Sequence, residues 1–356
     1  MSEHKFEPDY AVPPGTTLKE VLDSKGMSQA DLCLRTGLAE KTVSQIVNGV
    51  APISFETAEK FELAIGVPAS FWNAREVAYR QVIAQADESQ RLASCKEWLK
   101  EIPVKELIAR GLVSETKDSV LLVREAFKFF EVSSVESWRR TWTNPTAQYR
   151  GREAQSRHPG FVAAWLRMGE IKAAEIDCES FDAKRFAEAL REARDLTVGS
   201  AKNWPDDLRD LFAPTGVAVV FVKEIPRAGV SGVARWLSKD KALIQVSLRF
   251  KSDDQLWFSF FHEAGHILLH GKRKMFVEYG RHDDTTEEKE ANEFARDLLV
   301  PPERSAELPL LKTKRAMKAF ANEVGVSPGI VVGRLQFDGL LPPSHCNDLK
   351  RKLVWS

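Results

Sequence analysis

The stretch QLWFSFFHEAGHILLHG, residues 255–271, decides the fold of the C-terminal half of this 356-residue chain. Apolar residues fill the turns around its two histidines, which predicts a buried helix. His262 and His266 are four residues apart, so both imidazoles project from one helix face, about 6 Å apart. Burial of this polar pair needs a reason, and a metal ion supplies one. We expect both histidines to bind one Zn²⁺ ion, with Glu263 beside the open coordination position.

The third ligand has to come from another segment. His270 continues the four-residue series, but it lies about 12 Å along the helix from His262. We therefore expect His270 to support the site or the helix end rather than to bind the ion. The extended HExxHxxGxxH arrangement needs a glycine where this chain has Leu269, which excludes that class of metal site.

A carboxylate for the site is offered by TTEEKEANEFARDLLVP, residues 285–301. Its apolar positions predict an amphipathic helix, and Glu288 lies on the same side as Ala291. Glu288 is the predicted third ligand. Asn292, one turn further on, is placed to hydrogen-bond a ligand imidazole and to fix its tautomer.

Two alternatives to Glu288 as a ligand stay open. Glu287 is the second choice for the metal ligand, whereas Glu290 points further away. The plain structural interpretation is an acidic helix N-terminus favoured by the helix dipole, with Thr285 or Thr286 as its cap. Ligation and dipole stabilisation are compatible with each other.

The segments around these motifs predict an α+β region. GVAVVFVKEI (216–225) and KALIQVSLRF (241–250) are rich in β-branched residues and predict two strands, with a third short strand at 233–237. Helical patterns follow. They cover residues 252–270, 286–299, 313–324 and 328–337.

The first 80 residues predict a compact all-α module. Four short helices at 17–25, 28–36, 39–48 and 54–65 are each followed by glycine. SQADLCLRTGLAEKTVSQIVNG, residues 28–49, has the helix, glycine turn and second helix of a helix-turn-helix, with Gly37 at the turn. The predicted core of this motif comprises Leu32, Leu38, Val43, Ile46 and Val47.

The fold class predicted for the whole chain is mainly α with a small sheet. We expect a helix-turn-helix DNA-binding domain at residues 1–80, a helical connector at 81–204 and an α+β domain with the metal site at 205–356. The connector carries many tryptophans and arginines but no motif tied to chemistry. Its amphipathic charged face is expected to be solvated.

The composition of the chain excludes several classes of protein. The 51 basic and 51 acidic residues balance, and 43% apolar residues exclude a disordered chain. The four cysteines, with no CxxC pair, favour neither a disulfide framework nor a zinc ribbon. No signal-like or membrane-spanning apolar stretch is present, so we expect a soluble cytoplasmic protein with no membrane partner.

Three segments together resemble a known family. HEAGHILLH, EKEANEFARDLLVP and FANEVGVSPGIVVGRLQFDG resemble the ImmA/IrrE family of zinc metallopeptidases over residues 205–341. This resemblance implies a gluzincin-like endopeptidase whose relatives act on helix-turn-helix repressors. It also implies that His262, His266 and Glu288 bind zinc and that Glu263 is the catalytic base. Tyr279, Arg281 and His282 are the candidates for the oxyanion donor that hydrolysis requires.

The N-terminal module resembles the HigA-like antitoxin branch of the Cro/CI-type repressors over residues 11–80, which implies DNA binding and autoregulation. Residues 1–80 carry 8 basic and 11 acidic side chains, so attraction to phosphate is weak and a homodimer would help binding. The docking rule of the fold places one set of residues at the DNA. They are Gln29 at a helix start and Ala39, Glu40, Lys41, Thr42, Ser44 and Gln45 on the recognition helix.

Two functions of different classes follow. The first is a zinc-dependent endopeptidase fused to a DNA-binding module, which acts in transcription regulation by cleaving a repressor, an antitoxin or its own chain near residues 68–110. The second is a DNA-binding antitoxin or repressor, with a toxin as its partner in the antitoxin case, whose metal domain is a sensor or a structural element. Glu263 discriminates between them, because a purely structural site does not require a carboxylate beside the open position.

Overall fold

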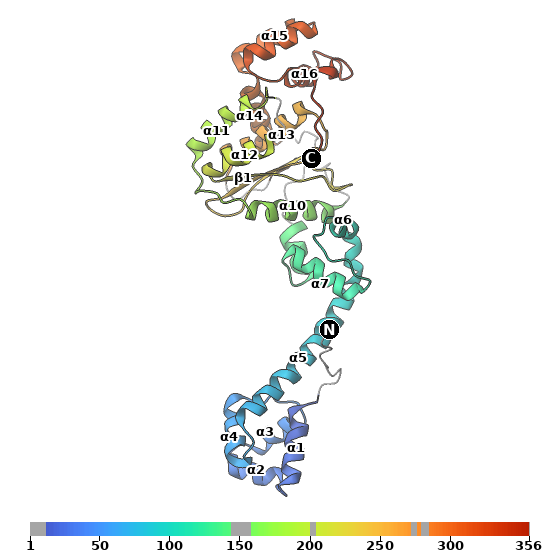
Figure 1. Ribbon diagram of the computed structural model, residues 1–356, viewed down its shortest axis with the longest axis vertical. Coiled ribbons are helices and arrows are strands. Elements are labelled where there is room, and N and C mark those ends of the chain that lie inside the picture. The colour runs from blue at the N-terminus through green and yellow to red at the C-terminus, as the bar shows by residue number, and fades with distance from the viewer. Residues whose placement is uncertain (1–11, 144–157, 200–203, 272–275, 279–284, 356) are drawn as a thin grey trace, which may run out of the picture. The chain divides into compact units, whose positions relative to one another are not determined.

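The computed structural model describes residues 12–143, 158–199, 204–271, 276–278 and 285–355 (Figure 1). It divides the chain into two compact units, residues 1–95 and 96–356. The described residues are mainly helical with one small sheet. The predicted fold class is therefore confirmed.

The first unit is all helical. Its second helix begins with a capping box, in which Ser28 and Asp31 each bind the other's backbone N–H, and it ends at Gly37 in the left-handed conformation (φ +68°). The turn that follows leads directly into the predicted recognition helix. The helices of this unit are α1 (Pro14–Ser24), α2 (Gln29–Thr36), α3 (Glu40–Val47), α4 (Phe55–Ile65) and α5 (Ala69–Ser94).

The core of the first unit contains the helix-turn-helix residues that the sequence predicted. Leu32, Val43 and Ile46 are buried among residues from all five helices, including Trp72 of α5. Leu38 and Val47 are partly buried against this core. Helix α5 runs through the predicted domain limit at residue 80, because its first half closes this core.

The second unit is built on a four-stranded sheet in the order β1-β3-β2-β4. Strand β1 (Val217–Phe221) is parallel to β3 (Ala242–Val246), whereas β2 (Gly232–Trp236) is antiparallel to β3 and to β4 (Phe276–Glu278). The first three strands lie where the sequence predicted them. Strand β4 was not predicted, because three residues are too few to show a strand pattern.

The other elements of this unit are helical. The earlier ones are α6 (Val104–Ala109), α7 (Ser119–Phe130), α8 (Val135–Trp138), α10 (Pro159–Ala174), α11 (Ala183–Asp195) and α12 (Trp204–Phe212). The later ones are α13 (Asp253–Leu269), α14 (Thr286–Leu299), α15 (Lys314–Val324) and α16 (Pro328–Phe337). Short helical segments η1 (Lys96–Glu101), η2 (Arg139–Thr143), η3 (Ala213–Thr215), η4 (Pro302–Leu310) and η5 (Asn347–Leu349) complete the unit.

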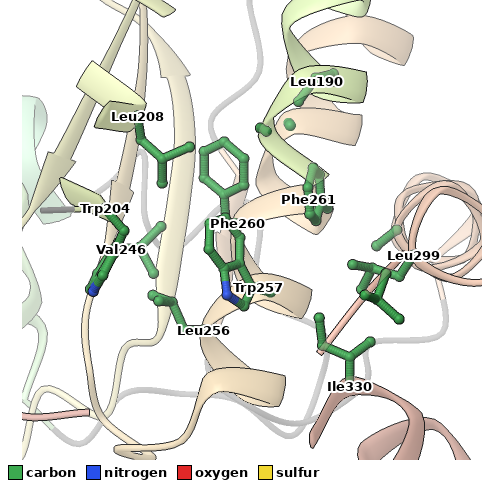
Figure 2. Close-up of a cluster of buried hydrophobic side chains, with 14 of the residues drawn as sticks. Leu190, Trp204, Leu208, Val246, Leu256, Trp257, Phe260, Phe261, Leu299 and Ile330 are labelled. Carbon is green, nitrogen blue, oxygen red and sulfur yellow. The ribbon is translucent and has the colours of Figure 1, made fainter. Parts of the chain in front are cut away.

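Helix α13 covers one face of the sheet and forms the centre of the core. Alternate strand residues, such as Val219, Ala234 and Ile244, point to this face, as their cross-strand register requires. Figure 2 shows Trp257 and Phe260 of α13 at the centre of this core. The same cluster contains Leu190 of α11, Leu208 of α12, Leu299 of α14 and Ile330 of α16.

The opposite face of the sheet is covered by α10 (Figure 1). Here Gln245 donates a hydrogen bond to the backbone oxygen of Trp165 (2.7 Å), and Arg235 forms an ion pair with Glu170 (2.9 Å). A Cβ atom at Gly169 would lie only 1.7 Å from the Gln245 side chain, so α10 approaches the sheet closely. Helices α10 and α11, both within residues 81–204, thus pack on the elements that follow them. The three-domain division stays a prediction.

The N-terminus of α13 is held by a buried carboxylate. Asp253 is 1% exposed and accepts hydrogen bonds from Ser327 Oγ (2.8 Å) and from the backbone N–H (2.9 Å) and Nε (3.1 Å) of Arg351. Its position in the first turn also suits the helix dipole. The C-terminal residues therefore fix the start of the helix that carries the two histidines.

Helices that could cross a bilayer were also sought. Within the described ranges, none combines the necessary length with sufficient apolar character.

We expect Asp253→Ala to destabilise the second unit by about 3 kcal/mol, because a buried, hydrogen-bonded ion pair loses one partner. Urea unfolding followed by tryptophan fluorescence measures this, since eight of the nine tryptophans lie beyond residue 95. Asp240→Ala is the control, because the Asp240 carboxylate forms an exposed 3.6 Å pair with Lys239 and its loss should change the stability by less than about 0.5 kcal/mol. Equal midpoints for the two variants would contradict this account of the helix start.

Candidate metal centre

Two helices bring the predicted ligands together. The Nε2 atoms of His262 and His266 are 3.0 Å apart, and they lie 3.1 and 3.3 Å from the two carboxylate oxygens of Glu288. Both histidines are 2% exposed. These three residues form a group whose ligand atoms all lie within 4.8 Å of one another.

The close packing of α13 on α14 makes this approach possible. Gly265 lies between the two histidines, and a Cβ atom there would be 3.3 Å from Ala291 Cα and 3.1 Å from the ring of Phe294. The missing side chain lets the two helix backbones approach each other. The carboxylate on the first turn of α14 thereby reaches the imidazoles on α13.

The outer ring nitrogens of both histidines have partners. His262 Nδ1 lies 3.2 Å from Asn292 Oδ1, an acceptor, so this nitrogen carries the proton. His266 Nδ1 lies 3.0 Å from His270 Nδ1, and His270 Nε2 lies 3.0 Å from the carboxylate of Glu290. His270 donates to that carboxylate through Nε2–H, which leaves its Nδ1 to accept from His266.

These tautomers leave lone pairs on both inner nitrogens. Burial lowers the pKa of His266 to about 4, against a hydrogen bond with Glu288 that raises it, so the ring is neutral at pH 7. For Glu288, burial raises the pKa, but the adjacent His262 and His266 side chains lower it by more, so the carboxyl is ionised. With their protons on Nδ1, the two imidazoles and the ionised carboxylate therefore point only acceptor atoms at a common centre. Such a buried arrangement needs a cation.

The donor set fits Zn²⁺. Ligand bonds of about 2.0–2.1 Å in a tetrahedron place neighbouring donors about 3.3 Å apart, close to the 3.0–3.3 Å separations between these atoms. Two imidazoles and one carboxylate leave one tetrahedral position open, as in catalytic rather than structural zinc sites. His262, His266 and Glu288 are thus the residues that could hold the ion.

Glu263 is fully buried between the helix and the sheet. A Cβ atom at Gly232 would lie 2.5 Å from Glu263 Oε1, so the carboxylate packs directly against the β2 backbone. Position 232 therefore has to be glycine for the Glu263 carboxylate to keep its place. No periodicity in the sequence marks Gly232 for this role.

Phe276 of β4 covers the other side of the site. Its ring stacks on His266 with a centroid distance of 3.8 Å and an angle of 12° between the planes. The contact excludes water from this face of the imidazole and restricts its rotation. The sequence analysis missed both Phe276 and Glu290. Glu290 does point away from the ligand nitrogens, as predicted, but it lies against His270.

The other candidates from the sequence take different positions. Glu288 rather than Glu287 joins the cluster, and Thr285 caps α14 by accepting a hydrogen bond from Glu288 N (3.3 Å). The oxyanion candidates Tyr279, Arg281 and His282 lie outside the described residues.

A cleft extends from the cluster along helices α13, α14 and α16. Apolar side chains and two arginines line it beyond the ligands. The apolar ones are Phe258, Leu299, Val300, Ile330 and Phe337, and the arginines are Arg296 and Arg334.

The predicted DNA-reading residues lie on α3 and at the start of α2. Glu40, Lys41 and Ser44 are exposed, as are Ala39 before the helix and Gln29 on α2. Thr42 and Gln45 are partly buried. Both signs of charge are present on this surface, so phosphate attraction depends on few side chains.

Two family models match the chain. Residues 18–72 match the model described as helix-turn-helix, and residues 220–336 match peptidase family M78, described as IrrE N-terminal-like domain. The chain thus joins an XRE-type helix-turn-helix region, which supports DNA binding, to an ImmA/IrrE-type peptidase-family domain. The second match contains all the residues of the cluster. A comparison with curated proteins gave no match.

We expect the residues that orient the imidazoles to affect metal affinity. Asn292→Ala and His270→Ala should each weaken zinc binding roughly 10–100-fold, because the ligand rings lose the partners of their Nδ1–H groups. Competition with a chromophoric chelator measures the dissociation constant. Glu293→Ala, an exposed change on the same helix, should leave it unaltered. If all three variants bind zinc as tightly as the wild type, these contacts do not orient the ligands.

Proposed function

We propose that this protein is a zinc-dependent endopeptidase fused to a DNA-binding module and that it acts in transcription regulation. The observation that carries the proposal is the buried convergence of His262, His266 and Glu288, all acceptors, with one coordination position left open. The neighbouring Glu263 supplies the carboxylate that a structural site does not need. The match to peptidase family M78 over the same residues supports this interpretation.

Each side chain has a distinct role in the proposed hydrolysis. His262, His266 and Glu288 would hold Zn²⁺, which lowers the pKa of a water molecule and polarises the scissile carbonyl group. Glu263 accepts a proton from the attacking water as the new carbon–oxygen bond forms. It then donates that proton to the departing amine as the carbon–nitrogen bond breaks, so that no net proton is consumed in the cycle.

The surroundings of Glu263 suit this exchange. The carboxylate is enclosed by α13 and β2, which excludes bulk water and strengthens its interaction with a nearby proton donor. His270 and Glu290 keep His266 in the tautomer that offers Nε2 to the ion. Asn292 does the same for His262.

The helix-turn-helix region defines where the peptidase would act. A protein held at an operator is close to other proteins bound at that operator, which raises their effective concentration for the peptidase. A repressor or an antitoxin is therefore the proposed substrate, and the chain itself, near residues 68–110, is the other proposed target. A toxin partner, the HigA-like role and a homodimer stay predictions from the sequence.

We expect Glu263→Gln to retain zinc but to lose cleavage by at least about 100-fold, because the amide cannot accept the water proton. Zinc content by atomic absorption and cleavage of a panel of purified helix-turn-helix repressors, followed by mass spectrometry, are the two measurements. Glu293→Gln on the exposed face of α14 is the matched control. Cleavage that persists in Glu263→Gln would favour another base, and cleavage by neither protein would favour the sensor or structural function.

For DNA binding, we expect Lys41→Ala to weaken binding to all sequences and to reduce the slope of log K against log salt by about one. Gln45→Ala should instead reduce discrimination at one base pair by about 1–3 kcal/mol. An operator selected from random DNA, titrated at several salt concentrations, provides both values. Lys60→Ala on α4, where Lys60 pairs with Glu56, is the charge-matched control. Equal effects of Lys41→Ala and Lys60→Ala would contradict the predicted docking of α3.

A further inference from the structure

The cleft beside the metal ligands is lined by residues at a four-residue spacing. Glu288, Asn292 and Arg296 follow one another on a single face of α14, and all three line the cleft. Phe258 and His262 of α13 form the facing wall. The metal cluster and Arg296 therefore belong to one continuous cavity.

Arg296 is held in place by two contacts. Its Nε donates a hydrogen bond to the backbone oxygen of Asn292 (3.2 Å), and its guanidinium lies 5.8 Å from the ring centroid of Phe337. The side chain thus folds back toward the N-terminus of α14, as long helical side chains commonly do. The guanidinium is thereby directed toward the end of α14 that carries Glu288.

The charges along the cleft leave Arg296 uncompensated. Arg334 pairs with Asp338 (2.7 Å), and the buried carboxylate of Asp254 pairs with Lys350 (2.7 Å). No carboxylate of the described chain lies within ion-pair distance of Arg296. Glu288 faces the two histidines and, in the proposed function, the metal ion.

The walls of the cleft increase the effect of this charge. Phe258, Leu299, Val300 and Ile330 are apolar and lower the local dielectric, which strengthens a charge-assisted hydrogen bond. A planar guanidinium with free N–H groups matches a carboxylate with two hydrogen bonds. The occupant that fits this end of the cleft is an anionic group with a short apolar stem.

We propose that Arg296 binds a carboxylate of the substrate peptide close to the scissile bond and so determines substrate specificity. The inference rests on the proposed peptidase function. Arg296 lies about 12 Å along α14 from Glu288, and an extended chain advances about 3.3–3.6 Å per residue, so a group three or four residues from the cluster reaches Arg296. The carboxylate comes either from a Glu or Asp side chain or from the C-terminus of the peptide.

The first test of the role of Arg296 measures peptide binding to a variant that cannot cleave the peptide. The probes are fluorescein-labelled peptides from a positional library that carry Glu, Gln or Leu, each with a free or an amidated C-terminus. Full-length zinc-loaded Glu263→Gln protein should bind the best carboxylate peptides at least about tenfold more tightly than their amide counterparts. Adding Arg296→Gln should abolish this preference, whereas Arg296→Lys should restore part of it.

The arms of the experiment separate the two sources. A preference for Glu over Gln within amidated peptides identifies a side-chain carboxylate, and a preference for the free acid alone identifies the C-terminus. Arg315→Gln, an exposed charge change on α15, is the matched control and should keep the preference. Circular dichroism of each variant confirms that it is folded.

The inference and the proposed function can fail independently. If wild-type protein cleaves peptides but neither binding nor KM distinguishes carboxylate from amide, the role of Arg296 is overturned and the peptidase function stands. If no peptide is cleaved in the presence of zinc, the peptidase function fails. The binding preference, present or absent, then still decides whether Arg296 recognises a carboxylate.

Discussion

The second unit depends on the convergence of three buried acceptor atoms on one centre. Two imidazole nitrogen lone pairs and a carboxylate repel one another in a medium where water cannot screen them. Their positions are held from outside, by Asn292 on one ring and by His270 and Glu290 on the other. The helix packing that enforces this arrangement is favourable only if a cation offsets the repulsion. The same contacts therefore favour a metal site over a cluster with a structural role alone.

The sequence predicted those features that depend on spacing along one element. The four-residue separation of His262 and His266 defines a helix face, and the pattern around Glu288 placed it on a facing helix, so the cluster could be inferred before its geometry was known. Phe276 and Gly232 could not be inferred in this way. Their roles come from the pairing of β2 with β4 and from the approach of α13 to β2, which no local pattern encodes.

The middle of the chain, residues 81–204, shows a related limit of prediction from sequence patterns. It was predicted to be a helical connector with a solvated charged face, yet Trp165 of α10 is buried against the sheet, and Arg235 of β2 donates a hydrogen bond to the backbone oxygen of Leu166 in the same layer. A buried arginine is rare unless it is paired, and Glu170 supplies the partner. The amphipathic pattern of α10 is weak because the helix is covered on most sides, and a weak pattern carries little information about what covers it.

Glu263 illustrates how the sheet constrains the chemistry. Its carboxylate fills the space that a side chain at position 232 would occupy, so the strand and the proposed base are complementary in shape. A buried carboxylate is costly in free energy unless a proton or a positive charge is near, and the neighbouring metal cluster provides that charge when it is loaded. Metal binding should therefore stabilise the folded unit as well as the reacting groups, which couples the stability of α13 to the chemistry it carries.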